Sequence, residues 1–276
     1  MTLAEDVETL LSRFSGTAGL CAERLGSAER VAIRADEPFP TASAIKPFIL
    51  LALFHAAQTQ SLELGERVPL TAAARTLGSG VLLHLDAGLE PTLGDLATLM
   101  MMLSDNLATN LLLDRLGTER VNESIREAGL GHTELRGPID FSRLARDKSA
   151  LGVSTPAELG RFFARLAQGE LLDASWTARM LDVMRIQKYI EPLRRELPAD
   201  PYAREFGEPE PVWVASKTGS LSGVRCEAGL VHTPKARWAI AVMTKDGSDR
   251  RVTSDNEGVL LIARASRLVY DAWSEP

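Results

Sequence analysis

The chain has 276 residues, 45% hydrophobic and 25% charged, a balance that allows a sizeable core in one large or two small domains. Its net charge of −6 argues against nucleic acid or an anionic membrane as a partner. The opening MTLAEDVE is acidic where a signal peptide is basic, and no segment approaches the roughly 18 apolar residues that span a bilayer. We expect a cytoplasmic monomer, or a periplasmic or secreted protein if an export signal has been removed.

The first part of the chain alternates between helical and strand patterns. Apolar residues at helical spacing predict a helix over 3–14, and two strands over 17–25 and 30–36 are expected to turn near Gly26. A long apolar helix should begin near Ala42 or Ser43, since Pro47 fits only its first turn.

The middle of the chain, from about 60 to 190, is helical in pattern. Residues 136–153 are the exception, because their periodicity is weak and they read as a long surface loop.

Strand patterns return after residue 210. They cover 212–219, 225–233 and 237–246, and a last helix follows, with Ser254 and Glu257 expected to cap it. This order predicts an α/β (α+β) fold, in which both chain ends form an antiparallel sheet flanked by helices. We assign residues 1–55 and 200–276 to this α/β domain and residues 56–199 to an all-α domain, with the active site in the groove between them.

Neither a metal nor another cofactor is expected. The four histidines form no ligand pattern, and Cys21 and Cys226 lack metal-ligand spacing. We expect both cysteines to be free, buried thiols.

Ser43 and Lys46 form the first motif with chemical potential, S-x-x-K. Residues three apart share a helix face, so the lysine can reach the serine hydroxyl. A desolvated lysine can be neutral enough to act as the base that activates a serine nucleophile. The alternative is an ordinary helix serine beside a solvated lysine.

Ser104–Asp105–Asn106 forms a second motif, S-D-N, between two predicted helices. Its serine could relay a proton and its asparagine could hold an amide. A helix cap is the alternative, and we prefer that interpretation for the second copy of the tripeptide, residues 254–256.

Lys217–Thr218–Gly219 ends a predicted strand and is the third motif. S-x-x-K, S-D-N and K-T-G in this order are the signature of class A β-lactamases and penicillin-binding proteins. The chain therefore resembles that superfamily, and the class A branch most, over nearly its whole length. The resemblance implies an α/β domain and an all-α domain with the site between them.

The resemblance also implies catalytic roles. Ser43 would be the nucleophile, Lys46 its proton acceptor, and Ser104 the relay that protonates the leaving nitrogen. Backbone N–H groups of Ser43 and Ser220 would form the oxyanion hole.

Substrate-binding roles follow in the same way. Asn106 would hold a side-chain amide, and Lys217 and Thr218 would bind the substrate carboxylate. Gly219 would leave room for the ligand beside the strand. Arg225 resembles a second carboxylate-binding cation, with a structural Arg–acid pair as the alternative.

One departure concerns deacylation. Class A enzymes carry E-x-x-L-N in the loop before the "TTP"-like helix start, and residues 136–153 lack it. Asp140 is the candidate substitute base, although its side chain is shorter; pairing with Arg136 or Arg143 is the alternative. The expected substrate is a small β-lactam or an acyl-D-Ala-D-Ala-like molecule. The expected activity is a serine β-lactamase; a D-Ala-D-Ala-type peptidase, an esterase and a non-catalytic penicillin-binding sensor stay open.

Overall fold

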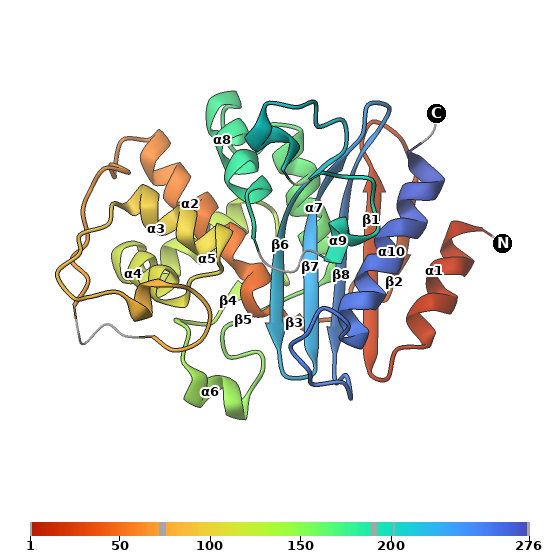
Figure 1. Ribbon diagram of the computed structural model, residues 1–276, viewed down its shortest axis with the longest axis horizontal. Coiled ribbons are helices and arrows are strands. Elements are labelled where there is room, and N and C mark those ends of the chain that lie inside the picture. The colour runs from red at the N-terminus through yellow and green to blue at the C-terminus, as the bar shows by residue number, and fades with distance from the viewer. Residues whose placement is uncertain (1, 72–75, 189–191, 201, 275–276) are drawn as a thin grey trace.

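A five-stranded antiparallel sheet forms the centre of the molecule (Figure 1). The computed structural model describes residues 2–71, 76–188, 192–200 and 202–274. The strand order is β2-β1-β8-β7-β6, so the two ends of the chain pair through β1 and β8, as the sequence predicts. The strands are β1 (Thr17–Arg24), β2 (Arg30–Ile33), β6 (Trp213–Leu221), β7 (Val224–His232) and β8 (Arg237–Lys245).

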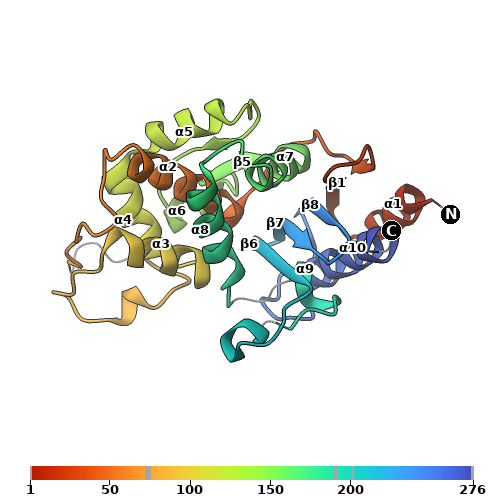
Figure 2. The same cartoon turned by 90° about the horizontal axis from the view of Figure 1, so that it is seen from above.

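The alternation of side chains along β8 divides the core between the two faces of the sheet. Trp238, Ile240 and Val242 point to the face covered by α1 (Leu3–Ser12), α9 (Pro192–Arg195) and α10 (Glu257–Trp273). Ala239, Ala241 and Met243 point to the other face, where α7 (Pro156–Ala167) packs (Figure 2). This is the period of two that strand geometry requires.

The second body of helices surrounds α2 (Lys46–Gln58), which is preceded by the 3₁₀ turn η1 (Ala42–Ile45). Apolar residues occur all round α2, as expected for a helix buried on every side. The helices around it are α3 (Leu93–Met102), α4 (Asn106–Leu116), α5 (Thr118–Glu127) and α8 (Ala174–Arg185). The predicted two-domain division stays a prediction, but α7, which it groups with the middle helices, covers the sheet.

Residues 136–153 contain more regular structure than the predicted loop. They include α6 (Phe141–Arg146) and most of β5 (Gly152–Ser154), which pairs with β3 (Phe39–Pro40) and β4 (Glu134–Leu135) in a small second sheet. The helix is short, with a single buried residue, Leu144, so it leaves little periodicity in the sequence. Short 3₁₀ turns, η3 (Leu82–His84) and η4 (Ala203–Phe206), complete the described elements.

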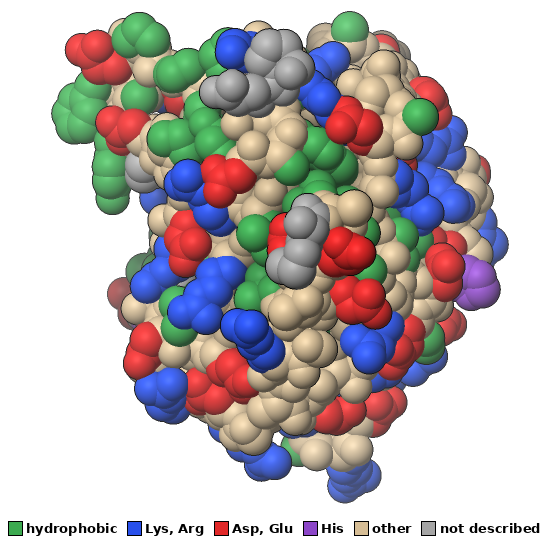
Figure 3. Space-filling view, turned by 90° about the vertical axis from the view of Figure 1, so that its right-hand side faces the viewer, with side chains coloured by type: hydrophobic (Ala, Val, Ile, Leu, Met, Phe, Trp, Pro, Cys, Tyr) green, Lys and Arg blue, Asp and Glu red, His purple; other side chains and the backbone are tan. Residues whose placement is uncertain are grey.

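The surface carries both signs of charge. On the face that Figure 3 shows, acidic and basic side chains are interspersed, and α10 contributes an i,i+4 ion pair between Arg267 and Asp271. Within the described ranges, no helix has the length and apolarity to cross a bilayer.

Candidate active site

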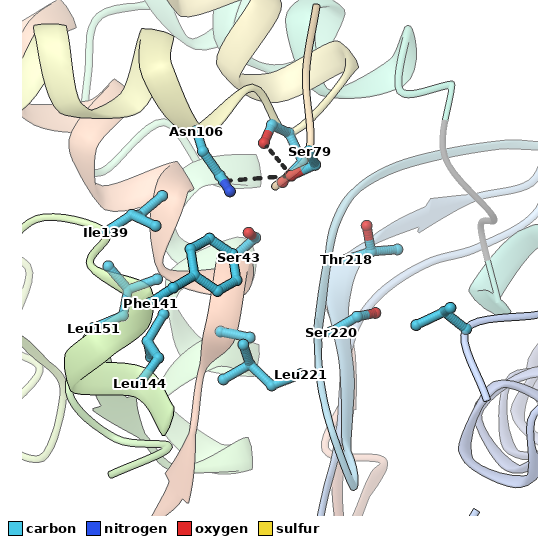
Figure 4. Close-up of a pocket in the computed structure, with 13 residues that line it drawn as sticks. Ser43, Ser79, Asn106, Ile139, Phe141, Leu144, Leu151, Thr218, Ser220 and Leu221 are labelled. Atoms are coloured by element: carbon cyan, nitrogen blue, oxygen red, sulfur yellow. Dashed lines mark hydrogen bonds between the residues drawn. The ribbon is translucent and has the colours of Figure 1, made fainter. Parts of the chain in front are cut away.

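Ser43 lies on η1, where the chain passes from the sheet into α2. The predicted helix start near Ala42 is confirmed as this 3₁₀ turn, and Pro47 stands in the first turn of α2. Beside Ser43 is a cavity of about 370 Å³ (Figure 4). Its polar lining comes from Ser79, Ser104, Asn106, Thr218 and Ser220. Its apolar lining includes Ile139, Phe141, Leu144, Leu151 and Leu221. The three predicted motifs therefore meet at one cavity.

Lys46 is completely buried beneath this cavity. Its ammonium donates to the Ser104 carbonyl at 2.7 Å, to Ser104 Oγ at 3.0 Å and to Asn106 Oδ1 at 3.1 Å. None of its hydrogen bonds within the described chain goes to the Ser43 hydroxyl, so the direct contact predicted from the spacing is not formed here. Burial, and then the nearby Lys217 cation, hold the pKa of Lys46 well below its usual range. The lowered pKa makes loss of a proton from Lys46 less costly than from an exposed lysine, as a general base requires.

Ser104 is held in an uncommon left-handed conformation, with φ of 52°. Its carbonyl accepts from Lys46 and from Ser79 Oγ, at 2.8 Å. The next residue, Asp105, caps α4 through the N–H of Ala108 and also accepts the N–H of Val81. The tripeptide therefore serves both as a helix cap and as a wall of the cavity. In the second copy, Asn256 is the cap, and the prediction of Ser254 is wrong.

Ser79 is a site residue that the sequence interpretation missed. Its hydroxyl donates to the Ser104 carbonyl and lies 3.3 Å from Asn106 Oδ1. Two glycines with positive φ flank it, and a Cβ on Gly80 would lie 2.2 Å from the Asp105 carboxylate. The Gly-Ser-Gly pattern could have indicated this residue, because glycines on both sides of a serine are typical of a close approach between backbone segments.

Lys217 and Thr218 lie on β6, the edge strand of the sheet nearest Ser43. Both are buried, and both donate to one acceptor, the side-chain oxygen of Gln187. No motif in the sequence points to Gln187, which follows α8 and reaches β6 only through the fold. It is the second site residue that the sequence interpretation missed.

Gly219 has a packing role that the sequence interpretation did not include. A Cβ on this residue would lie 2.4 Å from the Thr41 carbonyl and 2.8 Å from the Ala44 nitrogen, both on the backbone at η1. The glycine thus lets β6 approach the turn that carries Ser43, and its predicted role in leaving room for a ligand stays a prediction.

The geometry of β6 supports the predicted oxyanion hole. The Thr218 N–H donates to Gln187 Oε1 on the free edge of the strand. Backbone groups two residues apart point the same way in a strand, so the Ser220 N–H also faces this edge. The Ser43 N–H lies in the first turn of η1, where a helix offers no internal acceptor. Both donors lie at the Ser43 cavity, which their residues line.

Arg225 does not line the Ser43 cavity. Its guanidinium donates to the carbonyls of Leu221, Val224 and Arg251. It lines a second cavity of about 100 Å³, which shares Thr218 and Ser220 with the Ser43 cavity. Among the described residues its hydrogen-bond partners are backbone carbonyls, and no acidic side chain forms an ion pair with it. The predicted contact with a substrate carboxylate stays a prediction.

Asp140 is also placed away from the cavity lining. Its carboxylate caps α6, accepting from Ser142 N at 2.8 Å and Ser142 Oγ at 2.6 Å, and it is solvent-exposed. These hydrogen bonds, first of all the one from the Ser142 hydroxyl, lower its pKa. The neighbours Ile139 and Phe141 line the cavity instead. The prediction of Asp140 as a deacylation base is therefore not supported, and no acidic side chain occurs among the described residues that line this cavity.

The comparison with known families agrees with this geometry. The family model described as "Beta-lactamase enzyme family" matches residues 2–273. The chain belongs to the β-lactamase family. It is accordingly a hydrolase, and the serine type fits the class A members among its relatives.

Relatives with known sequences or structures cover nearly the whole chain. A carbapenem-hydrolyzing β-lactamase, KPC, of Klebsiella oxytoca is 33% identical over 98% of this chain and 88% of its own. The crystal structure of a β-lactamase from Sphaerobacter thermophilus superposes with a TM-score of 0.86 and 30% identity, covering 97% of this chain and 96% of that one. PBP-A, solved as its L158E mutant in an acyl-enzyme complex with penicillin G, gives 0.84 and 30%, covering 99% and 97%. The predicted family and fold are confirmed.

Proposed function

We propose that the protein is a serine hydrolase that reacts through an acyl-enzyme, in which β-lactams acylate Ser43. The observation that carries this proposal is the buried Lys46, with a lowered pKa, hydrogen-bonded to Ser104 below the cavity that Ser43 lines. Names of relatives such as KPC, and the penicillin complex of PBP-A, add support.

The acylation step uses this chain's own residues throughout. Ser43 Oγ attacks the lactam carbonyl carbon and its proton passes to Lys46 Nζ, which acts as the general base. The N–H groups of Ser43 and Ser220 stabilise the developing oxyanion. The carbon–nitrogen bond then breaks. The Lys46 proton reaches the ring nitrogen through Ser104 Oγ, with which Nζ is hydrogen-bonded at 3.0 Å.

The deacylation step has less support from the residues in place. A general base must lie within hydrogen-bond reach of the attacking water. The segment between residues 139 and 151 presents apolar side chains to the cavity, and Asp140 is turned to α6. This observation favours a second candidate function: an enzyme that acylates and releases slowly, as a penicillin-binding D-Ala-D-Ala-type peptidase does, or an esterase that uses more reactive acyl groups.

A penicillin time course followed by intact-mass spectrometry tests both steps. Mixing with benzylpenicillin should add the mass of one penicilloyl group to the wild type and nothing to Ser43→Ala. An adduct that persists supports slow release, whereas rapid return to the unmodified mass supports an efficient β-lactamase. Absence of a Ser43-dependent adduct, together with absence of turnover of a chromogenic cephalosporin, would overturn the proposal.

A further inference from the structure

Gln187 occupies the place where the carboxylate-binding donors of β6 converge. Its side-chain oxygen accepts from Lys217 Nζ at 3.1 Å, from Thr218 N at 3.1 Å and from Thr218 Oγ1 at 3.0 Å. Gln187 is 3% exposed, and Lys217 is fully buried. A neutral amide oxygen has two lone pairs, so one cationic and two neutral donors exceed its accepting capacity. This donor set suits the oxygen of a carboxylate better than that of an amide.

A chain of hydrogen bonds fixes the orientation of the amide. Its Nε2 donates to Ser216 Oγ at 3.3 Å, and Ser216 Oγ donates to Glu227 Oε1 at 2.6 Å. Lys217 Nζ and the Thr218 N–H can only donate, so the amide oxygen must face them. The amide nitrogen then faces Ser216 Oγ, which accepts from it.

The same donors are next to the cavity of Ser43. Thr218 lines that cavity, and Figure 4 shows its side chain on the wall opposite Asn106. A substrate acylated at Ser43 that carries a carboxylate would bring it toward Thr218. It would then compete with the Gln187 oxygen for the same hydroxyl and ammonium.

We propose that Gln187 is a specificity-determining residue: its amide oxygen is an internal occupant of the carboxylate subsite, which an anionic substrate must displace and a neutral ester or amide need not. The proposal rests on the proposed function for the position of the reacting carbonyl at Ser43. It predicts a weaker preference for carboxylate-bearing substrates than the β6 donors alone would give.

Non-covalent binding to Ser43→Ala tests this without any acylation step. The two ligands are benzylpenicillin and its methyl ester, which differ in the carboxylate charge, and the readout is the ratio of their dissociation constants. Adding Gln187→Ala should shift this ratio toward the acid by about tenfold or more, the scale of one charge-assisted hydrogen bond. Adding Gln187→Glu should shift it toward the ester, because a resident carboxylate then holds Lys217.

The controls separate specificity from a general structural effect. Gln58→Ala, an exposed glutamine at the end of α2, should leave the ratio unchanged. Gln187→Glu keeps an acceptor beside the buried Lys217, so it serves if Gln187→Ala fails to fold. An unchanged ratio, a shift of the same sign in both variants, or no binding of either ligand would overturn the inference. The penicilloyl adduct on wild-type Ser43 is measured separately, so failure of the proposed function is recognised independently.

Discussion

At the scale of single residues, burial determines the chemistry of the site. Lys46 and Lys217 are both fully buried, and the Lys217 cation adds to the effect of burial in lowering the pKa of Lys46. The S-x-x-K spacing indicates the pair Ser43 and Lys46 from sequence alone. It does not indicate that the ammonium would bond to Ser104 and Asn106, because those contacts depend on how α2 packs against α4.

The acylation rate should depend on the protonation of Lys46. Because its folded pKa is well below 10.5, the rate should rise with pH through this lowered value and then level off. Lys46→Ala should reduce acylation by about 10²–10⁴-fold, the usual contribution of a general base. Stopped-flow acylation by a chromogenic cephalosporin measures both, and exposed Lys235→Ala is the matched control. A rate that does not change with pH would argue for another base.

Asp140→Asn should leave deacylation within about twofold of the wild-type rate, because the carboxylate caps α6 and does not line the cavity. The decay of the penicilloyl adduct by intact mass provides the measurement. Deacylation that slows by an order of magnitude would restore Asp140 as the base.

At the scale of elements, the junction of β6 with η1 aligns the two halves of the site. The strand brings Lys217, Thr218 and Ser220, and the turn brings Ser43. The order of helices and strands, and the identity of the three motifs, could be predicted because periodicity and motif spacing are local properties of the sequence. The contacts of Ser79 and Gln187, and the placement of Asp140 and Arg225 outside the lining of the Ser43 cavity, depend on tertiary packing, which motif spacing does not specify.

Gly219→Ala should destabilise this junction, since the added Cβ meets backbone atoms that cannot move independently. Overpacking of this kind costs about 1–3 kcal/mol of unfolding free energy. Denaturant titration measures the loss, and acylation should weaken as well. Gly65→Ala, with no atom within 4 Å of the new Cβ, is the control. Equal stabilities of the two variants would show that β6 does not lie this close to η1 in solution.

At the scale of the whole molecule, a buried carboxyl links stability to pH. Glu227 on β7 accepts from Ser216 Oγ and from the Leu193 N–H, and burial raises its pKa to about 7. The unfolded chain releases this proton near 4.5, whereas the folded chain retains it to about 7. The unfolded state therefore binds fewer protons in this interval, and stability falls as pH rises from 4.5 toward 7.

Glu227→Gln should remove this part of the pH dependence. The contribution amounts to about 3 kcal/mol across the interval, from 1.36 kcal/mol per pKa unit. Denaturant midpoints at a series of pH values, at constant ionic strength, compare the variant with the wild type. Parallel pH profiles would show that Glu227 ionises in the folded protein as it does in the unfolded chain.

The predicted free thiols are confirmed, and one of them has a practical consequence. Cys226 is buried beside Gly219, its Sγ donates to the Thr41 carbonyl at 2.8 Å, and burial raises its pKa to about 12. A thiol in this position reacts with an alkylating reagent only when the strand and the turn separate. The rate at which Cys226 is labelled therefore reports how often β6 and η1 separate. The same strand and turn carry the oxyanion donors, so a covalently bound penicillin should lower the labelling rate of Cys226. Ligand binding would then be linked to local opening of the native fold.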